Sequence, residues 1–167
     1  MVTEKPKRRP QEGDELWFGL VGPIRVSNEM TPEREAWVHA GRIAQAAHLL
    51  PDLAALVTSH PDPRVRCEAI PRLRARFPND PETLQALAVA SVSADAMVRQ
   101  AAVMALGDLD GTDAADLIAE RLHDGDFDVR LSAAEELGYL GDERAPADPE
   151  SWALESMLDR DEHDEFP

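Results

Sequence analysis

The chain has 167 residues and a net charge of −16, with 43% hydrophobic but only 5% aromatic residues. This composition favours one helical domain packed through Ala and Leu over a β-sandwich or barrel. No apolar run reaches the about 18 residues of a membrane span, and the single cysteine, Cys67, excludes an internal disulfide and a thiolate-based metal site within one chain. Because the start shows no signal-peptide pattern, we expect a cytoplasmic protein.

Residues 1–30 differ from the rest of the chain. Four basic residues in positions 1–9 are followed by Glu15–Val26, an apolar run interrupted by Gly and Pro. Such a run cannot form a long helix, so we predict an extended arm or short strand. Two roles are open: the arm folds onto the first helices and caps them, or it docks on a partner.

Eight helices are predicted after the arm. A capping residue repeatedly stands before Pro, as at Thr31, Asp62, Asp80 and Asp148, and further helices begin at Asp95, Thr112 or Asp113, and Asp126. The predicted ranges are 32–49, 51–59, 63–76, 81–92, 96–108, 113–123, 127–140 and 149–159. Residues 160–167 form a polar, acidic tail.

A sequence motif recurs in this helical part. The pattern D-x-x-V-R begins at Asp62, Asp95 and Asp126, with its valines 33 and 31 residues apart. Four and eight residues after each valine stand Ala and then Leu, which share one helical stripe with it (Val65, Ala69, Leu73; Val98, Ala102, Leu106; Val129, Ala133, Leu137). A fixed period of this size is typical of stacked two-helix units. The sequence predicts an all-α fold, a right-handed α-solenoid of antiparallel helix pairs, with a repeat domain at 31–159 and about three core repeats at 51–141.

The helices Val98–Gly107 and Val129–Gly138 open with V-R, are rich in Ala and Leu, and end with L-G. This pattern resembles the HEAT-like repeats also found in phycobilin lyase subunits. The resemblance implies a ladder between repeats in which Arg66, Arg99 and Arg130 bond to Asp62, Asp95 and Asp126. An arginine beside the buried valine lies at the edge of the core stripe and needs acceptors at the seam between repeats, so the residues themselves favour a structural role.

No catalytic group or metal site is expected. None of the five histidines pairs with another at helical spacing, and no phosphate-binding G-x-x-x-x-G-K motif occurs. No cofactor is implied. Residues 108–167 hold 20 acidic residues and four arginines, which should repel nucleic acid and anionic membranes and could steer a basic partner. The alternative is a solvated acidic face that only keeps the protein soluble.

Positions two and six residues after each repeat valine should face outward. They hold Cys67 and Pro71, Gln100 and Met104, Leu131 and Glu135, of which four are apolar or soft. We interpret them as a docking ridge on the concave face, flanked by arginines (partner-binding set: Pro71, Arg72, Arg76, Gln100, Met104, Leu131, Glu135). The arm or a second copy of the chain could instead cover this ridge.

The function predicted from these patterns is a non-enzymatic scaffold or adaptor that binds another protein, possibly a basic one. Neither nucleic acid nor membrane is an expected partner, and the oligomeric state stays open. One alternative is an acidic neutraliser of a basic enzyme, as an immunity protein or nucleic-acid mimic would be. A second alternative, resting on the resemblance alone, is an auxiliary subunit of a lyase.

Overall fold

A computed structural model of the chain describes residues 15–17, 23–25, 31–109 and 111–161. The chain divides into two compact units, residues 1–35 and 36–167. In the first, β1 (Glu15–Trp17) pairs antiparallel with β2 (Pro23–Arg25), with Leu16 opposite Ile24. These strands lie in the predicted arm. The rest of that arm and residues 162–167 of the predicted tail lie outside the described residues.

Each of the eight predicted helices is present. They are α1 (Pro32–Ala46), α2 (Leu50–Ser59), α3 (Pro63–Arg76), α4 (Pro81–Ser91), α5 (Ala96–Gly107), α6 (Thr112–Glu120), α7 (Phe127–Leu140) and α8 (Pro149–Asp161). A 3-10 helix, η2 (Arg121–His123), completes the segment predicted as one helix with α6. None of the helices among the described residues is long and apolar enough to cross a membrane.

Aspartate side chains cap the starts of α3, α4, α5 and α7, as predicted. Asp62, Asp80, Asp95 and Asp126 each accept a hydrogen bond from a backbone N–H in the first turn. These bonds satisfy N–H groups that have no partner within the helix. The prediction of a Thr112 or Asp113 cap is wrong, because α6 begins after Gly111, whose φ of 126° requires glycine.

The three aligned columns form the core. The valines, alanines and leucines of the repeat pattern are all buried (Val65, Val98, Val129; Ala69, Ala102, Ala133; Leu73, Leu106, Leu137). They belong to one apolar cluster with the facing side chains of the preceding helices, including Leu53, Leu87 and Ile118. The alanine column leaves room for the partner helix to approach closely, and the leucines fill the layer beneath.

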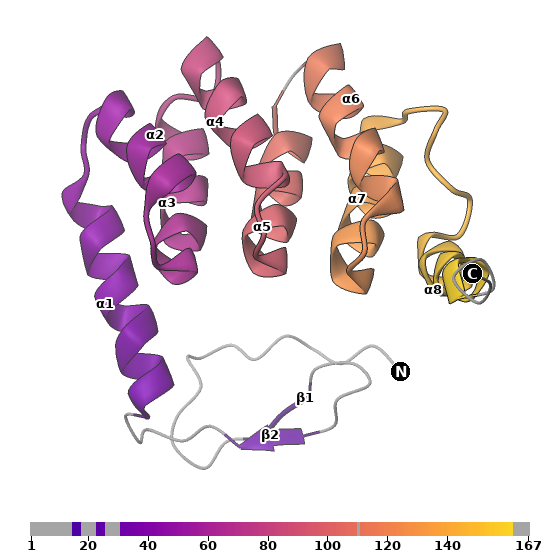
Figure 1. Cartoon of the computed structure of the whole chain (residues 1–167), viewed down its shortest axis with the longest axis horizontal. Coiled ribbons are helices and arrows are strands. Elements are labelled where there is room, and N and C mark those ends of the chain that lie inside the picture. The colour runs from indigo at the N-terminus through magenta and orange to yellow at the C-terminus, as the bar shows by residue number, and fades with distance from the viewer. Residues whose placement is uncertain (1–14, 18–22, 26–30, 110, 162–167) are drawn as a thin grey trace, which may run out of the picture. The chain divides into compact units, whose positions relative to one another are not determined.

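The helices form two layers. The pairs α2–α3, α4–α5 and α6–α7 are hairpins, and within one layer α3 packs on α5 and α5 packs on α7. The first helices form the other layer, α2 on α4 and α4 on α6, and α8 packs on α7. Figure 1 shows these pairs following one another in chain order. The helical unit is therefore the predicted α-solenoid.

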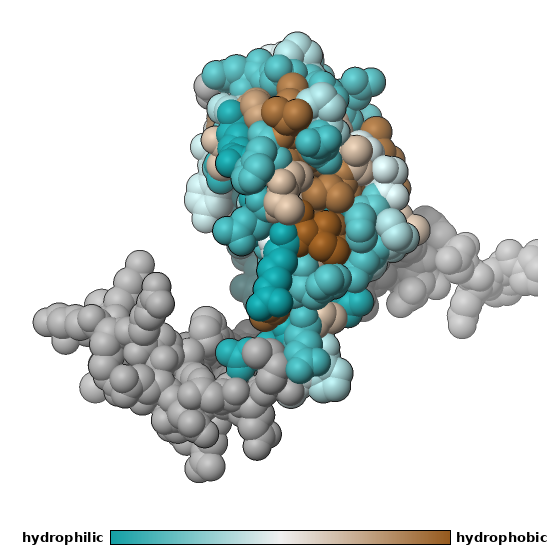
Figure 2. Space-filling model, turned by 90° about the vertical axis from the view of Figure 1, so that its left-hand side faces the viewer, coloured by the Kyte–Doolittle hydropathy of each residue, from teal (hydrophilic) through white to brown (hydrophobic). Residues whose placement is uncertain are grey.

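Among the described residues of the helical unit, no repeat packs on the outer side of α1 and α2. Apolar side chains run down this face between hydrophilic ones (Figure 2). The connection between α1 and α2 contributes the exposed Leu49. A stack whose repeats bury only each other's flanks leaves such a surface at its end.

Candidate functional site: repeat seams and the α3–α5 groove

The repeat arginines cross the seams between neighbouring units. Arg66 donates to the carbonyl oxygen of Val57 at 2.8 Å and to Oγ of Ser93 at 3.0 Å. Arg99 forms two hydrogen bonds with the carboxylate of Asp124, at 2.7 and 2.8 Å. Arg130 donates to the carbonyl oxygen of Ala153 in α8 at 3.0 Å. Each arginine thus bonds to the following repeat or helix.

Their predicted partners need correction. Asp62, Asp95 and Asp126 do not receive these arginines, because their carboxylates accept the N–H groups at the helix starts. Arg66 and Arg99 donate instead to Ser93 and Asp124, which stand two residues before the capping aspartates Asp95 and Asp126. His60 stands at the same position before Asp62. Each of these three residues also accepts the backbone N–H of the capping aspartate, at 3.2, 2.9 and 3.1 Å respectively.

The Arg99–Asp124 pair is the strongest of these contacts across the seams. The side chains are 16% and 6% exposed, so both are largely withdrawn from water. Burial alone raises the pKa of Asp124, but hydrogen bonds from Arg99 and from the N–H of Asp126 outweigh it and hold that pKa below its usual value. The hydrogen bonds with Asp124 raise the pKa of Arg99. The pair therefore stays charged at neutral pH.

A groove of about 310 Å³ lies between α3 and α5. Its lining comes from two matching sets, each at positions i, i+3, i+4 and i+7 of a helix, with Glu136 of α7 added (Cys67, Ile70, Pro71, Arg74; Ala101, Met104, Ala105, Asp108). Ile70 and Ala105 are buried at its base, whereas Met104 is 52% exposed. We call this the α3–α5 groove.

The charged groups of the α3–α5 groove differ in their partners. Arg74 forms an ion pair with Asp108 at 3.0 Å. Glu136 is half-buried, and among the described residues no hydrogen bond or ion pair reaches its carboxylate. Burial raises the pKa of Glu136, and the negative charges of Asp108 and Glu135 raise it further. Its charge is thus held where neither water nor a cation fully compensates it.

The structure brings together two of the seven predicted partner-binding residues, Pro71 and Met104. The other five lie outside the groove lining. Arg72 pairs with Glu68 on its own helix at 2.7 Å, and Arg76 donates to the carbonyl oxygen of Ala47 at 3.2 Å. Gln100 donates to Ser132 at 3.1 Å, Leu131 is half-buried and Glu135 is exposed.

Sequence reasoning missed Ile70, Arg74, Asp108 and Glu136 as groove residues. A signal for the first three existed in the matching i, i+3, i+4, i+7 spacing on two helices that the repeat pattern already made neighbours. Glu136 comes from the next repeat and had no such signal.

Other hollows in the described part of the chain are larger but lack the combination of an exposed methionine and an unpaired, half-buried carboxylate. Hollows of about 400 and 410 Å³ lie between α4 and α6 and between α2 and α4. Another of about 430 Å³ is formed by the turns around Pro78–Pro81 and Gly111–Ala114. The α3–α5 groove is distinguished by an exposed Met beside a carboxylate that lacks a partner. Among the described residues no group of three His, Cys, Asp or Glu side chains could hold a metal ion.

The repeat geometry agrees with a comparison against known families. The family model for HEAT repeats matches residues 87–165. The chain is a HEAT-like repeat protein. HEAT repeats form helical scaffolds that are often used for protein interaction. Comparison with curated proteins and with solved structures gave no significant match, and the likeness to phycobilin lyase subunits is not confirmed.

Proposed function

We propose that this HEAT-like repeat protein is a non-enzymatic adaptor that binds a segment of a partner protein in the α3–α5 groove. The observation that carries the proposal is the exposed Met104 above a base of buried Ile70 and Ala105. Methionine is flexible and polarisable, which suits it to contact varied apolar side chains. The neighbouring Ala101 leaves space for a guest chain to approach the helix.

The size of the groove limits the guest. About 310 Å³ is at the lower end of the range for ligand pockets and holds only a few side chains. We therefore expect a short segment, helical or extended, rather than a folded domain. Burying the exposed half of Met104 would contribute about 1 kcal/mol, so several apolar contacts are needed for useful affinity.

The test uses a displayed library of random peptides selected on the full chain. Selected peptides should bind the wild-type protein and lose at least about tenfold in affinity on Met104→Glu, which places a charge in the apolar wall. Met97→Glu is the matched control, because Met97 is 48% exposed on the same helix but is not part of the groove lining. Peptides that bind Met104→Glu as tightly as the wild type would refute the proposal.

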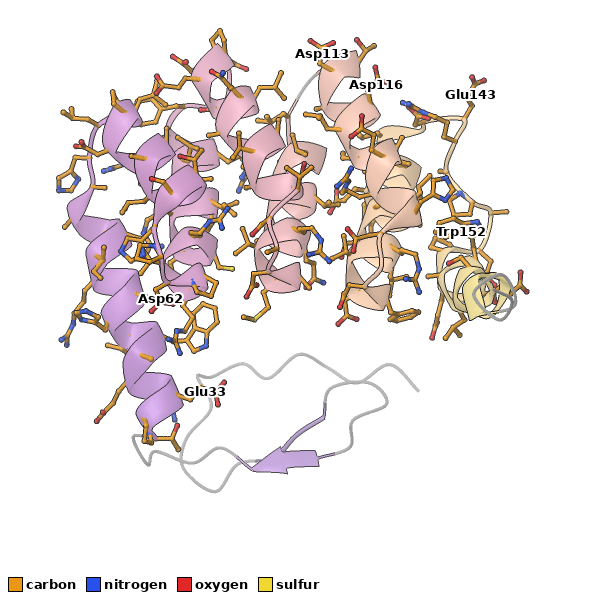
Figure 3. All side chains as sticks on the ribbon, in the orientation of Figure 1. Glu33, Asp62, Asp113, Asp116, Glu143 and Trp152 are labelled. Carbon is orange, nitrogen blue, oxygen red and sulfur yellow. The ribbon has the colours of Figure 1, made fainter. Side chains whose placement is uncertain are left out.

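A second candidate, the acidic neutraliser of a basic enzyme, is favoured by the side chains of the C-terminal third. Asp113 lies at the start of α6, and Glu143 lies on the connection to α8 (Figure 3), while Asp116 between them pairs with Arg144 at 2.8 Å. Such a surface would attract a basic protein through long-range charge. Its affinity should fall steeply with added salt, whereas binding through the α3–α5 groove, which is largely apolar and involves few charges, should fall much less. Titrations of a selected peptide and of a basic enzyme at low and high salt separate the two.

A further inference from the structure

We infer that the segment bound in the α3–α5 groove presents an arginine or lysine to Glu136, close to an apolar side chain that contacts Met104. This inference rests on the proposed function and adds the chemistry of the partner. It makes Glu136 a specificity-determining residue and not merely part of the acidic surface.

The position of Glu136 depends on Gly107, which has no side chain. A Cβ atom built on Gly107 would lie 2.0 Å from Oε2 of Glu136 and 2.6 Å from its Cδ. The carboxylate of α7 therefore packs over the backbone of α5 in space that only glycine leaves open. This contact brings a charged group from one repeat to the groove formed by the two repeats before it.

Two other acids at the seams of the same stack have cations, which Glu136 lacks. Asp108 pairs with Arg74 and Asp124 pairs with Arg99. Arg74 is the one cation among the groove-lining residues, and its partner is Asp108. The groove lining thus carries one positive and two negative groups, and the uncompensated charge is that of Glu136.

An unpaired, partly desolvated carboxylate is unfavourable in the free protein. A cation from a bound segment would remove this cost at the position that the carboxylate already occupies over Gly107. Binding energy gained in this way is largest for a charged hydrogen bond in a site that excludes water. The apolar walls provided by Pro71 and Met104 would exclude it once a guest is seated.

The experiment sequences the peptides selected from the displayed library and compares three variants. Selected peptides should carry Arg or Lys at a fixed spacing from a large apolar residue. Replacing that arginine by the neutral isostere citrulline should weaken binding to the wild-type chain about tenfold. On Glu136→Gln the same replacement should change affinity less than about twofold. Glu135→Gln, which makes the same charge change one residue away, should discriminate as the wild type does.

The third variant moves the carboxylate without removing it. Gly107→Ala should displace Glu136 and reduce the preference for arginine over citrulline, while thermal melts confirm that the fold is intact. Peptides that require Met104 but contain no cation, or that discriminate equally on Glu136→Gln and wild type, would overturn the inference and leave the proposed function standing. No selected peptide at all, or none that requires Met104, would overturn both.

Discussion

Asp124 joins two repeats and also supports the start of α7, so its replacement tests the seam directly. Its carboxylate accepts two hydrogen bonds from Arg99, at 2.7 and 2.8 Å, and one from the N–H of Asp126 at 2.9 Å. Asparagine keeps one acceptor oxygen but turns an amide group toward the guanidinium. We predict that Asp124→Asn lowers the free energy of unfolding by about 2 kcal/mol.

The magnitude follows from the environment of the pair. Breaking a fully buried pair by removing one partner costs about 3–5 kcal/mol. Arg99 remains 16% exposed, so water compensates part of the loss. A hydrogen bond to a charged group contributes about 1.5–3 kcal/mol, which agrees with a value near 2.

Urea unfolding followed by far-UV circular dichroism measures this change. Asp128→Asn is the charge-matched control, because Asp128 is exposed in the first turn of the same helix and should change stability by no more than about 0.5 kcal/mol. In an Arg99→Met background, Asp124→Asn should cost much less than in the wild type. An effect of Asp124→Asn within about 0.5 kcal/mol of zero at neutral pH would refute the role assigned to this seam.

The same pair predicts a pH dependence. The folded-state pKa of Asp124 lies below its ordinary value of 3.8. The stability it contributes is therefore fully present above that value and is lost as the pH falls through the lowered pKa. The difference between wild type and Asp124→Asn should be largest at neutral pH and should shrink in acid.

Two further predictions concern the groove. Glu136→Gln should raise the melting temperature at pH 7, because the pKa of Glu136 is raised above its ordinary value of 4.5 in the folded protein and its ionised form is therefore destabilising. Below about pH 4 the carboxyl group is protonated in both the folded and the unfolded chain, so the gain should disappear. Equal melting temperatures at pH 7 would contradict this. Burial raises the pKa of the Cys67 thiol to about 11, so alkylation of this single thiol should be slow at pH 8, should accelerate about tenfold per pH unit, and should slow further when a selected peptide fills the groove. Unchanged alkylation in the peptide complex would place the peptide elsewhere.

Much of the fold could be predicted because local and global signals agree. The capping aspartates set the helix starts, and the Val, Ala and Leu columns identify the buried face. The ladder partners could not be predicted in the same way, because an aspartate near an arginine in sequence can either cap a helix or bind the guanidinium. Capping takes precedence here. The acceptors across the seams are the hydroxyl of Ser93, the carboxylate of Asp124 and the backbone carbonyl oxygen of Ala153, which share no sequence pattern.

The site was harder to predict than the fold. Outward positions were assigned helix by helix, which placed Leu131 and Glu135 of α7 in the predicted ridge. A groove belongs to two helices, so its lining depends on how α3 and α5 face each other. Glu136 reaches this groove only because α7 approaches α5 closely at Gly107. The spacing of residues within one helix does not predict how closely two helices approach each other.

The seams also explain why the α3–α5 interface is suited to a guest. The seam between α5 and α7 is closed by the buried, bidentate Arg99–Asp124 ion pair. The seam between α3 and α5 is crossed by Arg66, which donates to the neutral hydroxyl of Ser93, and by the more exposed Arg74–Asp108 ion pair. Hydrogen bonds between two ionised groups are stronger than those to a neutral acceptor. In a stack held by nearest-neighbour contacts, the interface with the weaker bond opens more easily. A segment bound across α3 and α5 would add contacts at the seam that has the weaker polar bonds, so ligand binding should stabilise that seam more than the next one.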